Sequence, residues 1–325
     1  MYWTKSPGTG GKVEREEDFV VEEIPLKKFL AKFSRDSSGV SPIKGPYSLV
    51  LLKKKGMTTK DVIDFISRKL SISKEDIGYA GLKDKFAVTS QYMTIKGAID
   101  DIRTEKIELS RVGFTDKFMQ VGELEGNRFA ITLQDCKNPK NAERAVEEIK
   151  SRGMPNYFGP QRFGLHGNHL IGRLLLKRDF EKALGLINSQ SKKQFRSVKS
   201  VDKRKLKFYI HAYQSFLFNS ILDGYIKKNS KPFFGQFPIA GFGTKFGSAG
   251  KEMKRLLEEE KIKTEDFYLR ELGFKATGSS RPAFVKIEKI PFEINGTTLR
   301  MNFELPKGSY ATVIIGEIAK NPKSS

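Results

Sequence analysis

The sequence is poor in the residues that hold metals or form disulfides. Among 325 residues it has one cysteine and three histidines: Cys136, His166, His169 and His211. A single cysteine excludes an intrachain disulfide and a cysteine-rich metal site. His166 and His169 are three residues apart, but the glycines and asparagine around them favour a loop over a zinc-binding helix. We therefore expect no bound metal, and a reducing cytoplasm is the simplest setting.

The chain also lacks long apolar runs, and it has fewer acidic than basic residues. No stretch approaches the ~20 apolar residues that a membrane helix needs, and residues 1–8 lack the apolar core of a signal peptide. The chain has 59 Lys and Arg against 38 Asp and Glu, so its net charge is +21 and its pI is near 9.8. Such an excess favours a polyanionic partner, either RNA, DNA or an acidic membrane surface. The membrane is the weakest of these, because no long basic amphipathic helix stands out.

Hydrophobic residues make up 38% of the chain, enough to build a core for one large domain or two. Apolar alternation predicts strands, and 3.6-residue periodicity predicts helices. The expected strands are 12–24, 47–52, 92–95, 128–133, 284–294, 297–305 and 310–318. The expected helices are 59–70, 141–150, 169–186, 208–226 and 253–261, with a loop at 31–45 and a frayed tail at 320–325. Asn295-Gly296 is a strong hairpin signal. Together these elements predict an α+β protein with a mainly antiparallel sheet.

The most informative segment is 78–91, which reads Gly-Tyr-Ala-Gly-Leu-Lys-Asp-Lys-Phe-Ala-Val-Thr-Ser-Gln. It places one carboxylate, Asp84, between Lys83 and Lys85 and shortly after Gly81. Glycine permits a tight turn and the close approach of a ligand. The flanking cations are expected to keep the carboxylate ionised and to attract a polyanion. Taken alone, Lys-Asp-Lys is more typical of a solvated turn.

Two aromatic segments follow. Residues 155–164 read Pro-Asn-Tyr-Phe-Gly-Pro-Gln-Arg-Phe-Gly. Aromatic rings can stack on bases and an arginine can pair with phosphate, although an aromatic turn that closes a core edge is the alternative. Residues 211–219 lie on a predicted helix and fit core packing best.

These segments resemble the TruD family of tRNA pseudouridine synthases. The string 78–91 is similar to the family signature Ala-Gly-x-Lys-Asp-x-x-Ala-Val-Thr-x-Gln, and five other segments resemble family strings in the same order: 18–23, 126–129, 155–164, 211–219 and 305–312. The resemblance implies a pseudouridine synthase catalytic domain, with a mainly antiparallel sheet flanked by helices, interrupted by an α/β insertion domain. We place the catalytic domain at 1–173 and 283–325 and the insertion at 174–282, with tRNA expected in the cleft between them.

The resemblance also implies roles for individual residues. Asp84 corresponds to the catalytic aspartate, while Asn156 and Phe158 correspond to residues that line the uridine pocket. Further substrate-binding residues are expected at Lys83, Lys12, Gln161 and Arg162. Family members modify uridine 13 of tRNA, and some relatives accept other RNAs. The reaction requires no cofactor, since no atom is gained or lost, and we expect a monomer.

The chain departs from the family pattern in two places. Val13 stands where the family usually carries a lysine, so Lys12 or Arg15 is expected to pair with Asp84. Gly316 stands where many members carry arginine. The chain also has a basic segment, which we define by eight residues: Lys192, Lys193, Arg196, Lys199, Lys203, Arg204, Lys205 and Lys207. Contact with the tRNA backbone and a merely solvated face are both open for it.

Other functions remain open on the sequence alone. The chain could be an RNA-binding protein of this fold without catalysis, a general basic protein of RNA or ribosomes, or a synthase with a different RNA target. Dinucleotide binding is not expected, because the glycine-rich segment 241–247 lacks a clear strand–helix context. For catalysis, attack at C1′ of the ribose, attack on the base and proton abstraction from the ribose all stay open.

Overall fold

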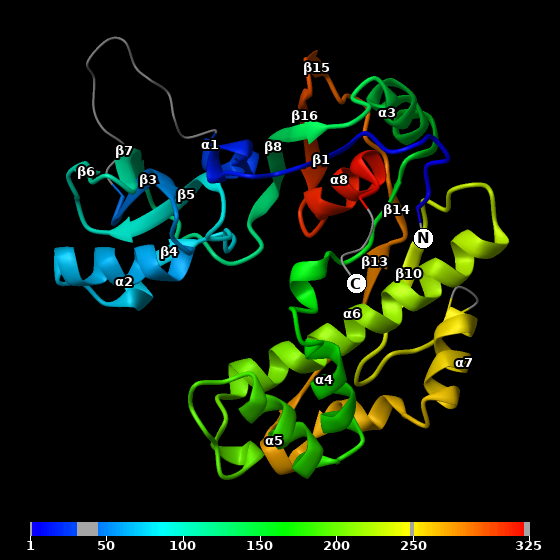
Figure 1. The fold of residues 1–325 in the computed structure, drawn as a ribbon. Helices are drawn as coiled ribbons and strands as arrows, with labels where there is room; N and C mark the ends of the chain where they lie inside the picture. Colours follow the sequence, from blue (N-terminus) through cyan, green and yellow to red (C-terminus); the bar gives the residue numbers. More distant parts are fainter. Residues whose placement is uncertain (1, 31–44, 248–249, 322–325) are drawn as a thin grey trace. The chain divides into compact units, whose positions relative to one another are not determined.

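The computed structural model describes residues 2–30, 45–247 and 250–321 (Figure 1). The chain divides into two compact units. The first unit comprises Met1–Lys5, Ser151–Lys286 and Thr312–Glu317, and the second comprises Ser6–Lys150, Ile287–Ala311 and Ile318–Ser325. The predicted insertion, 174–282, falls within the first unit. Of the predicted loop 31–45 and tail 320–325, residues 31–44 and 322–325 lie outside the described part of the chain.

The second unit is built on a ten-stranded sheet, with the order β15-β16-β8-β2-β5-β3-β7-β6 and with β1 added to β8 and β4 to β5. Every strand pair of this sheet is antiparallel except β2 with β5. The strands are β1 (Gly10–Lys12), β2 (Phe19–Pro25), β3 (Tyr47–Lys55), β4 (Ile77–Tyr79), β5 (Val88–Lys96), β6 (Ile102–Arg103), β7 (Ile107–Thr115), β8 (Leu124–Cys136), β15 (Phe292–Asn295) and β16 (Thr298–Pro306). The prediction of a mainly antiparallel sheet flanked by helices is confirmed.

Helix α2 (Thr59–Leu70) covers one face of the β3–β5 part of this sheet (Figure 1). Its apolar stripe, including Val62 and Ile66, packs against Val50 and Met93 in one fully buried cluster. The helix begins where Thr58 and Asp61 form a reciprocal capping box, which satisfies backbone N–H groups of its first turn. The same unit holds the short α1 (Lys27–Leu30) and most of α3 (Asn141–Arg152).

The register of the central strands fixes which loops meet. Strand β2 runs parallel to β5, with Val20 opposite Val88. Strand β3 runs antiparallel to β5, with Lys54 opposite Thr89. The start of β2, the start of β5 and the end of β3 therefore lie at one edge of the sheet. The segment that carries Asp84 leads into β5 at this edge.

The first unit is mainly helical, with α4 (Asn168–Leu176), α5 (Phe180–Ser189), α6 (Lys203–Lys228) and α7 (Lys251–Glu259). Three strand pairs accompany them: β9 (Met154–Pro155) with β14 (Phe284–Val285), β10 (Gln236–Ile239) with β13 (Ser279–Pro282), and β11 (Tyr268–Leu269) with β12 (Phe274–Lys275). Helices α4 and α6 cross closely at Gly172, where a Cβ would lie 2.1 Å from the Tyr209 carbonyl oxygen. Among the described residues, no helix combines the length and apolar character needed to cross a membrane.

Five local predictions need correction. The strand expected at 12–24 is only partly one, because a 3-10 helix, Glu16–Asp18, precedes β2. The strand expected at 284–294 is two strands, β14 and β15, which belong to different sheets. The single helix expected at 169–186 is two helices, because Arg178 adopts φ +59° between them and Asp179 caps α5. The strand expected at 310–318 is helix α8 (Ala311–Ala319), whose buried residues Ala311, Ile314 and Ile318 follow helical spacing. A short apolar run rich in β-branched residues fits either structure. The hairpin turn consists of Gly296-Thr297, one residue later than predicted, with Asn295 paired to Thr298.

Candidate functional site

Asp84 is exposed and lies four residues before β5. Hydrogen bonds at Gly81 and Lys83 fix the start of the loop that carries Asp84. Gln91 Nε2 donates to the Gly81 carbonyl (3.0 Å), and Thr59 Oγ1 donates to Gln91 Oε1 (2.9 Å) while accepting from the Lys83 backbone N–H (2.9 Å). Because Thr59 begins α2 and Gln91 belongs to β5, two regular elements hold this loop. Its carboxylate is thereby presented on a fixed backbone.

The two lysines beside Asp84 differ in their surroundings. Lys83 Nζ lies 2.5 Å from Glu23 Oε2, and their side chains are only 7% and 0% exposed. Burial raises the pKa of Glu23, and the neighbouring Lys83 opposes that rise. Lys85 is exposed. Lys83, expected to bind substrate, therefore points into the protein and anchors the loop to β2.

Gly81 lies close to this ion pair. A Cβ at that position would lie 3.3 Å from Lys83 Nζ and 3.5 Å from Glu23 Oε2. The contact with Lys83 Nζ would be tight, and the contact with Glu23 Oε2 would be an ordinary van der Waals contact. The glycine in the string thus serves the packing of the anchor beneath the loop.

Lys54 is a residue that sequence reasoning missed. It is 2% exposed, and its Nζ donates to the carbonyl oxygens of Met57 (2.5 Å) and Asp84 (2.8 Å). Burial lowers its pKa to about 8, while the negative charge of Asp84 opposes that shift. A signal existed in the sequence, because strand alternation puts Lys54 on the same face as Val50 and Leu52.

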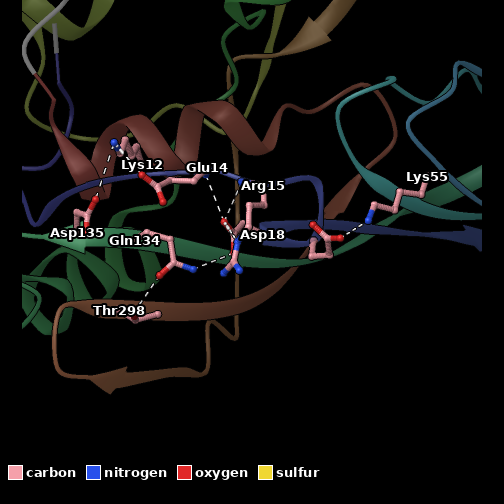
Figure 2. Close-up of polar contacts among 9 residues, drawn as sticks. Lys12, Glu14, Arg15, Asp18, Lys55, Gln134, Asp135 and Thr298 are labelled. Carbon is pink, nitrogen blue, oxygen red and sulfur yellow. Dashed lines mark hydrogen bonds and ion pairs between the residues drawn. The ribbon is translucent and has the colours of Figure 1, made fainter.

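Lys12 and Arg15, the cations expected to pair with Asp84, bind other carboxylates (Figure 2). Lys12 Nζ lies 2.8 Å from Glu14 Oε1 and 3.8 Å from Asp135 Oδ2. Arg15 Nε lies 3.7 Å from Asp18 Oδ2. Both cations are largely exposed, and neither of these ion pairs involves Asp84.

Asn156 lies in the first unit, directly after β9, and is buried. Both ends of its side-chain amide are engaged. Nδ2 donates to the Pro282 carbonyl (3.0 Å), and Oδ1 accepts from an Arg281 terminal nitrogen (2.7 Å). Arg281 Nε also donates to the Asn156 carbonyl (2.8 Å). Asn156 is therefore part of a buried hydrogen-bonded brace between β9 and β13.

Phe158 is half-buried and held by the same brace and by α6. The Arg281 guanidinium lies 4.2 Å from the centre of its ring, and Phe218 meets the ring edge-on at 5.5 Å. Asn219 accepts a hydrogen bond from the Phe158 N–H (2.9 Å) and donates to its carbonyl (3.0 Å). Arg281 was not singled out from the sequence, since nothing there separates it from the other basic residues. Asn219 belongs to the segment 211–219 that the sequence did mark.

Arg162 and Gln161 lie on the short 3-10 helix that follows, Pro160–Arg162. The Arg162 guanidinium is 5.6 Å from the ring centre of Phe158 and 5.8 Å from that of Phe208. Its Nε is buried without a hydrogen-bond partner in the described part of the chain. Gln161 is exposed. Arg162 thus connects the Phe158 ring to the exposed face of α6.

The basic segment joins α5 to α6 and continues into the first turns of α6. All of its cations are exposed except the half-buried Lys205. Lys193 and Lys205 lie 5.4 and 5.9 Å from the ring centre of Phe195. Within the described residues, none of these eight cations forms an ion pair with a carboxylate, so their charge is uncompensated by direct contacts.

Comparisons with known proteins point to one family. A family profile described as tRNA pseudouridine synthase D (TruD) matches residues 1–197 and 227–318. The tRNA pseudouridine synthase D of Anaeromyxobacter sp. (strain Fw109-5) is 32% identical, with 97% of this chain and 94% of the relative covered. The corresponding protein of Aquifex aeolicus is 29% identical, with 94% and 97% covered. The crystal structure of a putative tRNA pseudouridine synthase D from Methanosarcina mazei has the same fold, with a TM-score of 0.72, 24% identity and coverage of 99% and 96%.

Proposed function

We propose that this chain, which belongs to the tRNA pseudouridine synthase D family, isomerises a uridine of tRNA to pseudouridine. Asp84 is the catalytic residue in this proposal. The observation that carries this proposal is the exposed carboxylate of Asp84 on a loop fixed by α2, β2 and β5. A catalytic group needs such a fixed backbone, because misplacement by about 1 Å can cost on the order of 100-fold in rate.

The chemistry requires one well-placed carboxylate. Isomerisation breaks the N1–C1′ bond of uridine and forms a C5–C1′ bond, while the proton on C5 is lost and N1 takes up a proton. Substrate and product have the same atoms and oxidation level. Asp84 would serve as the nucleophile or stabilise the charge that develops at the sugar.

The brace around Asn156 supports a role for Phe158 in holding the base. A uridine that leaves its helical stack loses stacking energy of a few kcal/mol. Stacking on an aromatic ring returns about 1–3 kcal/mol per base. Phe158 would supply that ring, with Asn156 and Arg281 fixing its position and Arg162 facing the RNA backbone.

The basic segment supports tRNA as the substrate, because exposed cations without carboxylate partners can bind phosphates. By resemblance to the family, the target is position 13 of tRNA. We further propose 174–282 as the insertion domain, 1–173 and 283–325 as the catalytic domain, and the cytoplasm as the site of action.

The test is tritium release from tRNA labelled with [5-³H]uridine, since forming the C5–C1′ bond expels the hydrogen on C5. We expect release by the wild type, loss of at least 1000-fold in Asp84→Asn, and a tRNA Kd within threefold of the wild type in that variant. Asp100→Asn is the matched control, because Asp100 is an exposed aspartate of the same unit. It should retain full activity.

The rival functions give different results in the same assay. A non-catalytic RNA-binding protein would bind structured RNAs with similar affinity and release no tritium. A synthase with another target would release tritium from other RNAs and not from tRNA. Full activity of Asp84→Asn would remove the basis for the assignment.

A further inference from the structure

Lys54 is a buried cation that the proposed chemistry does not yet use. It lies next to the last residue of strand β3, before the chain enters α2, and its neighbours along the same face are Val50 and Leu52. Its ammonium joins two loops, because it donates to the carbonyl of Met57 ahead of α2 and to the carbonyl of Asp84 ahead of β5. One buried side chain therefore ties together two segments that are well separated in the sequence.

A lysine is a costly residue for this position. An ammonium that loses water without gaining a carboxylate partner is destabilised. In the described part of the chain Lys54 forms no ion pair, and its two hydrogen bonds go to neutral carbonyls. A methionine or leucine would continue the apolar face of β3 without that cost. The charge of Lys54 therefore calls for a reason other than packing.

The charged groups around Lys54 suggest that reason. Four of them act on its ammonium: Asp84, Asp61 and Glu16 favour its charged form, and Lys83 opposes it. Asp84 has the largest effect of the four. Two of the others are already committed, since Lys83 is paired with Glu23 and Asp61 caps α2. Asp84 is also the only one of these four residues for which a hydrogen bond from Lys54 is observed in the described part of the chain, through its backbone carbonyl.

We propose that Lys54 is the positioning residue for Asp84, holding the backbone of the catalytic loop in place while its positive charge stabilises the ionised carboxylate. This inference rests on the proposed function. A cation fixed beneath the loop matters most when RNA is bound, because the phosphates of the substrate disfavour a further negative charge nearby. The cation that Lys12 or Arg15 was expected to supply then comes from β3.

The coupling can be measured without any activity. In protein labelled with ¹³C-lysine, the Lys54 Cε signal, assigned by its loss in Lys54→Met, is titrated by NMR from pH 6 to 10. We expect a midpoint near 8 in the wild type, a midpoint at least 0.3 pH unit lower in Asp84→Asn, and no change in Asp100→Asn. A wild-type midpoint near that of an exposed lysine, or the same midpoint in Asp84→Asn, would overturn the inference.

Kinetics supply the second test. Lys54→Met is expected to lower kcat at least tenfold while the Kd for tRNA stays within threefold, since the residue acts on Asp84 and not on RNA. Lys55→Met is the control, because Lys55 is the exposed neighbour and pairs with Glu17. It should stay within twofold of the wild type.

The two tests separate this inference from the proposed function. A kcat for Lys54→Met within twofold of the wild type would contradict a positioning role. If the wild type itself released no tritium, the proposed function would fail, while the NMR titration would still report whether Lys54 and Asp84 are coupled. If Lys54→Met does not fold, the Lys54 signal is assigned by its loss in Lys54→Arg, and the titration of the wild type and Asp84→Asn decides.

Discussion

Replacing Lys83 by methionine should destabilise the protein strongly, although Lys83 is adjacent to Asp84 in a strongly basic chain. Its ammonium lies 2.5 Å from Glu23 Oε2, and the two side chains are 7% and 0% exposed. Removing one partner of a buried ion pair leaves the other charge uncompensated. That typically costs about 3–5 kcal/mol, and we expect a loss of this size in the free energy of unfolding at pH 8.

The loss should depend on pH in a definite direction. Burial already raises the pKa of Glu23 and Lys83 opposes that rise, so Lys83→Met should raise the pKa further. At pH values above the ordinary glutamate pKa of about 4.3, Glu23 of the folded variant then still holds a proton that the unfolded chain has lost. Stability of the variant consequently falls as pH rises through the folded pKa of Glu23. The difference from the wild type should therefore be smaller at pH 5 than at pH 8.

The assay is urea unfolding followed by far-UV circular dichroism at both pH values. Lys85→Met is the matched control, since Lys85 flanks Asp84 on the other side and is exposed. It should cost less than about 0.5 kcal/mol. The double variant Glu23→Leu/Lys83→Met should recover most of the loss, because an apolar pair can replace a buried ion pair. A loss below about 1 kcal/mol for Lys83→Met, equal to that of Lys85→Met, would refute the role of Lys83 as a buried anchor.

Two further predictions concern the first unit. Arg281→Met should lower the free energy of unfolding by about 2–4 kcal/mol, because two buried oxygen atoms of Asn156 lose their hydrogen-bond donor. The variant should also have a lower kcat. Wild-type stability and kcat would contradict a role for Arg281 in holding Asn156. Replacing Lys192, Lys193, Arg196 and Lys199 by glutamine should weaken tRNA binding. The slope of log Kd against log salt concentration should also decrease by about one for each phosphate contact that is lost. An unchanged slope would place the basic segment outside the interface.

Much of the fold could be predicted because its elements have clear periodicity. Helix α2 carries both an apolar stripe and a capping residue, and residues 128–133 of β8 alternate between buried apolar side chains and more exposed ones. The run at 310–318 could not be assigned correctly, since its isoleucines, valine and alanine suit a buried strand and a buried helix alike. Tertiary packing decides such cases, and periodicity cannot.

The sequence likewise reveals some residues of the candidate site and not others. Asp84, Asn156 and Phe158 could be singled out because they belong to strings that resemble a family signature. Arg281 could not, because what distinguishes it is a partner far away in sequence. Strand alternation marks Lys54 as a buried residue, but the sequence gives no sign of its partner. Lys54 is 30 residues from Asp84, and Arg281 is 125 residues from Asn156. Such pairs arise from strand register and helix packing, which a single sequence does not reveal.

Nucleotide-resolution mapping of pseudouridine is the most direct test of whether Asp84 is needed for uridine isomerisation in tRNA. Unmodified tRNA is incubated with the wild type or with Asp84→Asn, and the positions of new pseudouridines are compared. We expect pseudouridine at position 13 with the wild type and none with the variant. New pseudouridine at the same position with Asp84→Asn, or none with the wild type, would contradict the proposal.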